Sequence, residues 1–138
     1  MTRFRAVTRV AAARISVALL LVACGNIEEQ SLCRQWDDLQ AASAEVQALD
    51  PETATADDVE EVVDRALGEL EQFSRAAEGL YDGAVSTLRA ELVNLRQASH
   101  DAGSLTLEVA RPLLEETWAD TQTAYQVLAQ RLNIVCSG

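Results

Sequence analysis

Three cysteines and one histidine carry the most specific chemistry in this 138-residue chain. Cys24 lies near the N-terminus, Cys33 follows nine residues later, and Cys136 lies close to the C-terminus. With His100 as the single histidine, metal sites that need several histidines are excluded, and three thiols are too few for a large disulfide framework. The thiols can therefore form one disulfide, which leaves one cysteine for another role.

The first 23 residues have the pattern of a signal peptide. Four arginines precede the first acid, which is Glu28: Arg3, Arg5, Arg9 and Arg14. The stretch from residue 15 to residue 23 is apolar apart from one serine. A spanning helix needs about twenty apolar residues, so this stretch is typical of a signal h-region and not of a membrane span.

The four residues Leu21-Val22-Ala23-Cys24 resemble the lipobox of bacterial lipoproteins. The resemblance implies that the Cys24 sulfur receives a diacylglycerol and that the leader is cut before Cys24 by the lipoprotein signal peptidase. It also implies that the new amino terminus is often acylated, and two or three acyl chains anchor a protein firmly. We therefore expect anchoring to the outer face of a bacterial cell membrane. The alternative is an ordinary secretory leader that contains a coincidental cysteine.

The charge is strongly acidic, with 22 acids against 11 bases, all of them arginine. The formal net charge is −11, and it becomes −15 without the first 23 residues, because seven arginines then face the same 22 acids. Net negative charge disfavours nucleic acid and anionic membrane surfaces, since both attract proteins by their own negative charge. A cationic protein partner is the kind of partner that the charge favours, through steering.

The residues after the leader divide into a short polar tether, 24–30, and a helical domain, 31–138. Apolar side chains recur every three or four residues in four segments, the spacing of an amphipathic helix, and no segment of useful length alternates as a strand does. The first segment runs from Leu32 to Leu49 and ends before Pro51. Thr55 is expected to cap the second segment, with Asp58 as the acid three residues on.

The spacing predicts an all-α fold, an antiparallel four-helix bundle. Asp82 is expected to cap the third helix, which stops at Gly103, and Pro112 should start or kink the fourth. The apolar phase continues without a break through residues 79–83, so the alternative is three helices with one long middle helix over 57–102. Two acid–arginine pairs at a spacing of four should support the second helix: Glu61 with Arg65, and Glu71 with Arg75.

Cys33 and Cys136 bracket this helical domain. Exported proteins meet oxidising conditions, and an up-down-up-down bundle returns its last helix to the end where its first began. We therefore expect a disulfide between Cys33 and Cys136, with two buried free thiols as the alternative. Beyond the leader, Cys33, Thr55-Ala56-Asp57-Asp58, residues 85–92 and Cys136 loosely resemble small exported helical proteins of high-GC Gram-positive bacteria. That resemblance implies no activity.

Other residues that could do chemistry favour structural roles. Seven acids lie between Asp50 and Asp64, but a calcium loop that starts at Asp50 would carry Thr55 where glycine is needed. No catalytic motif frames His100. The five large aromatic side chains of the domain lie on the apolar stripes, where core packing is expected: Trp36, Phe73, Tyr81, Trp118 and Tyr125.

The sequence therefore predicts a lipid-anchored helical bundle that acts as a binding or structural module, without catalytic residues, metal or cofactor. The alternative is a small ligand carrier or enzyme with a site inside the bundle. A polar, well-formed internal pocket would favour that alternative, and a dry core would favour a scaffold.

Overall fold

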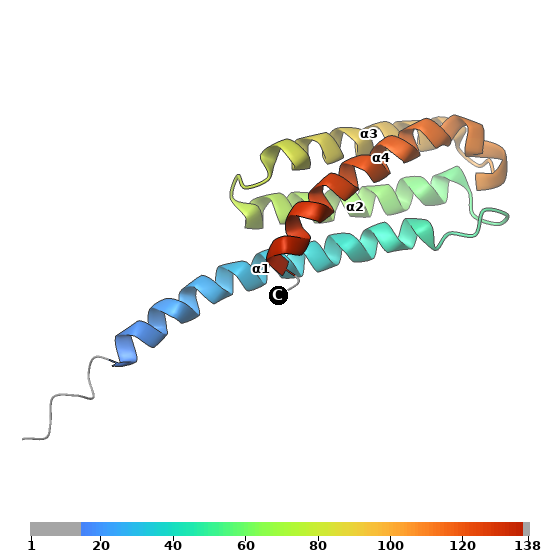
Figure 1. Ribbon diagram of the computed structural model, residues 1–138. Helices are drawn as coiled ribbons and strands as arrows, with labels where there is room; N and C mark the ends of the chain where they lie inside the picture. The colour runs from blue at the N-terminus through green and yellow to red at the C-terminus, as the bar shows by residue number, and fades with distance from the viewer. Residues whose placement is uncertain (1–14, 137–138) are drawn as a thin grey trace, which may run out of the picture.

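Four helices form an antiparallel bundle in the computed structural model, which describes the backbone of residues 15–136 and the side chains of residues 29–136. They are α1 (Ile15–Gln47), α2 (Ala56–Ala77), α3 (Asp82–Ala102) and α4 (Leu107–Cys136). Each helix packs mainly against the next one along the chain (Figure 1). The predicted four-helix bundle is thus confirmed, and the described residues contain no strand.

The long first helix includes the residues that we assigned to the tether. α1 is continuous from Ile15, and its N-terminal part projects beyond the other helices (Figure 1). The side chain of Cys24 and residues 1–14 of the predicted leader lie outside the described part of the chain. Within that part, no helix has both the length and the apolar character that a membrane crossing requires.

Local capping explains where α2 begins. The Thr55 hydroxyl accepts a hydrogen bond from the backbone N–H of Asp58, at 3.4 Å. The Asp58 carboxylate in turn accepts one from the backbone N–H of Thr55, at 2.8 Å. This reciprocal arrangement is a capping box, which satisfies two backbone donors at the helix start. The predicted cap at Thr55 is confirmed.

The α2–α3 turn excludes the single long middle helix. Glu78 and Tyr81 have positive φ angles of 50° and 67°, so the helical path is broken twice between the two helices. The prediction for Asp82 is wrong, because Asp82 is the first residue of α3 and Tyr81 occupies the N-cap position without a side-chain cap. The helical spacing of apolar residues can therefore continue across a turn without the helix itself being continuous.

The core is built from the predicted apolar stripes. Trp36 of α1 and Phe73 of α2 are almost fully buried and meet edge to face, with ring centroids 6.2 Å apart. Buried leucines from all four helices belong to the same core cluster: Leu32, Leu39, Leu70, Leu88, Leu92, Leu95, Leu128 and Leu132. Burial of this continuous apolar surface is the main stabilising contribution to the bundle.

The α1–α2 loop and the α3–α4 loop lie at the end of the bundle opposite the disulfide, and backbone hydrogen bonds connect them. Ala56 donates its N–H to the carbonyl of Leu105 at 2.9 Å, and Leu107 donates to the carbonyl of Ala54 at 2.9 Å. These bonds flank an isolated bridge between Thr55 and Thr106. The first turns of α2 and α4 are therefore held together by backbone bonds that do not depend on side-chain identity.

The prediction of ion pairs within α2, between Glu61 and Arg65 and between Glu71 and Arg75, is wrong. Arg65 instead contacts Glu45 of α1 at 2.9 Å, and Glu71 contacts Arg89 of α3 at 2.6 Å. A charged side chain beside a neighbouring helix can pair with a residue of that helix as well as with one on its own helix. The sequence of one helix alone does not show which of these two pairs forms. These exposed or half-exposed pairs contribute little stability, about 0–1 kcal/mol each.

Candidate functional site: a groove between α1 and α4

α1 and α4 meet closely at one end only. There Cys33 and Cys136 form the expected disulfide, with an S–S distance of 2.10 Å and a Cα–Cα distance of 5.5 Å. From that point α4 diverges from α1 toward α3, against which it packs along much of its length (Figure 1). The result is a wedge-shaped gap between the first and last helices.

An aromatic stack closes the narrow part of this gap. The Tyr125 ring lies on the Trp36 ring, with centroids 5.5 Å apart and planes inclined by 20°. The Tyr125 hydroxyl reaches α1, where it hydrogen-bonds with the side chains of Gln40 and Ser43. Together with the disulfide, these contacts fix the position of α4 relative to α1.

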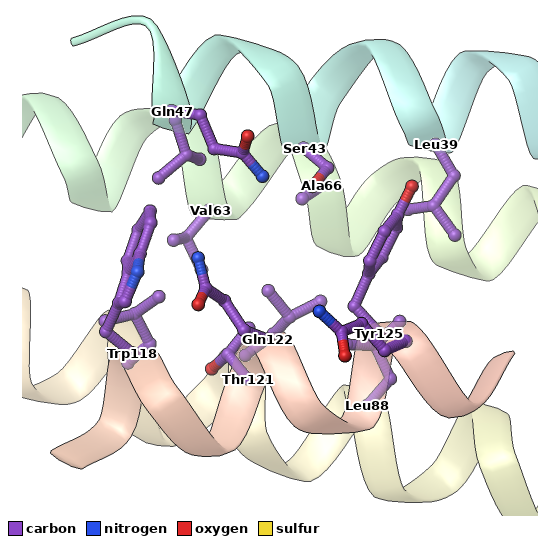
Figure 2. A pocket seen from close by; sticks show the side chains of 14 residues that line it. Leu39, Ser43, Gln47, Val63, Ala66, Leu88, Trp118, Thr121, Gln122 and Tyr125 are labelled. Atoms are coloured by element: carbon purple, nitrogen blue, oxygen red, sulfur yellow. The ribbon is translucent and has the colours of Figure 1, made fainter. Parts of the chain in front are cut away.

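Beyond Tyr125 the gap becomes a groove, whose inner compartment has a volume of about 180 Å³. Its floor is apolar and comes from α2 and α3: Val63, Ala66, Leu88, Leu92 and Leu95. Trp118, Gln122 and Tyr125 rise from α4 toward α1, and Gln47 extends from α1 toward α4 (Figure 2). The remaining lining residues complete the two walls: Leu39, Ser43, Val46, Thr121 and Gln126.

A second, outer compartment of about 370 Å³ continues the groove toward the α1–α2 loop. The two compartments share Val46, Gln47 and Trp118 in their linings. The outer one extends to Pro51 and Leu107 and includes the only charged lining residues of the two, Arg111 and Glu115. Trp118 therefore lies at the boundary between an inner space without charged side chains and an outer space that has two of them.

Small side chains explain why the groove is open. Ser43 on α1 and Ala66 on α2 line it at positions where larger apolar residues would fill the space. On α4, Thr121 directs its hydroxyl to the backbone carbonyls of Thr117 and Glu91, at 2.7 and 3.2 Å. The second of these bonds holds α4 against α3, and so keeps this part of α4 away from α1.

Tyr125 is the only ionisable residue that lines the inner compartment. Burial raises the pKa of the Tyr125 hydroxyl above its ordinary value of 10.0, and the hydrogen bonds from Gln40 and Ser43 lower it by a smaller amount. The hydroxyl is therefore neutral at physiological pH. It serves as a hydrogen-bonding contact between the helices.

This pKa shift predicts a pH dependence above pH 10. The folded state holds the Tyr125 proton more tightly than the unfolded chain does, so the stability from this group is complete below about pH 10. That stability is lost as the pH rises through the folded pKa. In a Tyr81→Phe variant, Tyr125 is the only tyrosine, and its phenolate absorbance should appear at higher pH in the native protein than in urea. A native midpoint at or below the urea midpoint would contradict the assignment.

The other residues that could do chemistry do not line the groove. His100 is exposed and lies 3.2 Å from Glu60, and Asp64 of the acidic run contacts Arg96 at 3.3 Å. Asp58 is engaged in the α2 cap. In the part of the chain with described side chains, no three histidine, cysteine or carboxylate residues gather as metal ligands would.

The sequence identified the aromatic residues but not the groove. Trp36 and Phe73 are buried as predicted, whereas Trp118 and Tyr125 are only half-buried and form groove walls. The one usable signal is the set of uncharged amides on otherwise acidic helices: Gln47, Gln122 and Gln126. These side chains flank the apolar stripes of α1 and α4, and all three are exposed at the groove rim.

The core around the groove is apolar, and the groove itself opens at the side of the bundle between its first and last helices. Its inner compartment has no charged side chain in its lining, amide groups stand at its rim, and three hydroxyl groups line it, those of Ser43, Thr121 and Tyr125. Comparison of the chain with protein-family models, with curated proteins and with solved structures finds no match.

Proposed function

We propose that this protein is a lipid-anchored binding module on the outer face of a bacterial cell membrane, with the α1–α4 groove as its binding site. The observation that carries the proposal is the groove: a largely apolar recess, with no charged side chain in its inner compartment, on an otherwise acidic protein. Ligand sites are commonly concave, mostly apolar and fitted with a few polar groups, and they occur between helices of bundles. A purely structural bundle has no need to leave such surface open to water.

The leader supports the membrane location. The basic first fourteen residues, the short apolar stretch and Leu21-Val22-Ala23-Cys24 together favour export and acylation of Cys24. Cys24 and Cys33 are nine residues apart on the same helix, which corresponds to about 14 Å along its axis. The disulfide-closed end of the bundle would then lie toward the membrane, and the open end of the groove would face away from it.

A catalytic role is not proposed. Catalysis of hydrolysis or group transfer needs an activated nucleophile, a tuned acid or base, or a metal near the substrate. The hydroxyls that line the inner compartment are those of Ser43, Thr121 and Tyr125, and all three have hydrogen-bonding partners within the bundle. None of them lies beside a histidine or a carboxylate in that lining, and burial raises the pKa of Tyr125. Cationic protein partners remain a further prediction from the acidic surface, through steering and not through groove chemistry.

Acyl labelling combined with in-cell crosslinking tests both parts of this proposal. Cells that express the wild type should incorporate an acyl label into the protein and retain it in the membrane fraction, and Cys24→Ala should lose the label. A photo-crosslinking residue in place of Gln47, at the groove, should give a specific adduct. The same residue in place of Gln72, on the exposed face of α2, should not.

The two parts of this test fail separately. Equal acyl label in the wild type and in Cys24→Ala would remove the lipid anchor. Identical adducts from Gln47 and Gln72, or none from either, would remove the groove as the binding site.

A further inference from the structure

We propose that the groove binds an uncharged, apolar small molecule, either a flat ring system or a single hydrocarbon chain, and not a peptide or a protein helix. This inference rests on the proposed binding role and specifies the class of ligand. The volumes of the two compartments, the lack of charged side chains in the inner one and the polar groups at its rim point to this class of ligand.

Size excludes a helical partner from the inner compartment. A cavity of about 150 Å³ with apolar walls accommodates one benzene ring, and the inner compartment here has about 180 Å³. A helix with its side chains is about 10–12 Å across, and each of its turns occupies far more volume than that. A ring or a stretch of chain fits, and a longer ligand can continue past Trp118 into the outer compartment of about 370 Å³.

Charge selects a neutral ligand. The inner compartment has no charged side chain, so a cation buried there would lack a carboxylate partner and an anion buried there would lack an arginine. Arg111 and Glu115 line only the outer compartment, where they offer one charge of each sign. Burial of an unpaired charge is costly. The surrounding protein is also strongly acidic, which lowers the local concentration of anions and so disfavours free fatty acids or phosphorylated ligands.

The polar groups at the rim can orient such a molecule. The hydroxyls of Thr121 and Tyr125 already have partners within the bundle. The side-chain amides of Gln47, Gln122 and Gln126 also line the groove, and none of them has a hydrogen-bonding partner within the part of the chain whose side chains are described. Each amide offers one acceptor and two donors, so a ligand with a single hydroxyl, carbonyl or amine can bond at the rim while its apolar part lies on the floor.

Trp118 has the position and chemistry of an aromatic wall for this ligand. Its half-buried ring lines both compartments and rises from α4 toward α1 (Figure 2). Aromatic pairs favour offset or edge-to-face contacts, which add to the stabilisation from buried area. A ligand that spans both compartments must therefore pass beside this ring.

The fluorescent amine N-phenyl-1-naphthylamine is a suitable neutral probe, and 1-anilinonaphthalene-8-sulfonate is its anionic counterpart. Both are titrated against the full chain that carries Cys24→Ser, which prevents acylation, with the Cys33–Cys136 bridge oxidised. We expect the neutral probe to bind with an affinity at least about tenfold higher than that of the anion. We also expect contact with Trp118 to change the tryptophan fluorescence.

Two matched variants locate the binding. Gln122 and Gln130 are both exposed residues of α4, but only Gln122 lines the groove. Gln122→Phe should fill the mouth of the groove and weaken probe binding by about tenfold or more, whereas Gln130→Phe should change it by less than about twofold. If circular dichroism shows that Gln122→Phe is misfolded, Gln126→Phe takes its place.

The outcomes separate the ligand class from the binding role. Equal effects of the two phenylalanine variants, or tighter binding of the anion, would overturn the inference. Protein adducts from the Gln47 crosslinker without any probe binding would also overturn it, yet would leave the binding role in place. Absence of both probe binding and groove adducts would remove the binding role as well.

Discussion

Replacement of both Cys33 and Cys136 by serine should lower the free energy of unfolding by about 4.7 kcal/mol in the chain-entropy model. The bridge joins residues with a sequence separation of 103, so it restricts nearly the whole helical domain of the unfolded chain. The expected effect is large for a second reason as well. α1 and α4 have few other contacts, and the disulfide is the covalent link that closes the narrow end of their gap.

Urea denaturation of the oxidised wild type and of the double variant, followed by circular dichroism, measures this loss. The single variant Cys33→Ser serves as a control, because it also removes the bridge and should lose a similar amount. A loss below about 1 kcal/mol would show that the two helices are held mainly by their side chains, and would contradict the prediction.

Trp36→Ala should destabilise the bundle by about 3–5 kcal/mol, the range for loss of a large buried aromatic side chain. Trp36 is 1% exposed, meets Phe73 of α2 edge to face and supports the Tyr125 ring of α4. Its removal leaves a cavity where three helices meet. It also removes the ring that positions Tyr125, so binding of the neutral probe should weaken together with the stability.

Trp118→Ala is the matched control for that variant. Trp118 is half-buried at the groove, so its truncation removes less buried area and should cost about 1–2 kcal/mol. Thermal unfolding of the two variants should therefore rank Trp36→Ala well below Trp118→Ala in stability. The opposite ranking would show that the groove wall, and not the Trp36 cluster, is the stabilising centre of the bundle.

The helices were predictable from the sequence because each presents one apolar stripe with the period of an α-helix. Thr55 and Asp58 identify the start of α2, and Cys33 with Cys136 indicate that the last helix returns to the start of the first. These signals are local or topological. They do not depend on how closely any two helices approach.

The groove and the ion pairs depend on that approach, and sequence reasoning did not find them. Whether Trp118 packs inside or lines an open wall is decided by the tilt of α4, to which the bond from Thr121 to the Glu91 carbonyl contributes. Likewise, Arg65 contacts Glu45 because α1 lies beside it, although Glu61 is at the favourable spacing on its own helix. Interhelical distances of this kind follow from the sum of many packing contacts.

The disulfide also has a consequence for proteolysis. Three loops join the helices, and all of them lie between Cys33 and Cys136, so this part of the chain is a covalently closed ring. A protease that cuts one loop opens the ring but releases no fragment, since the two pieces stay joined through the sulfur atoms. A single cut in any of these loops therefore leaves all four helices covalently connected, as two pieces of chain joined by the disulfide.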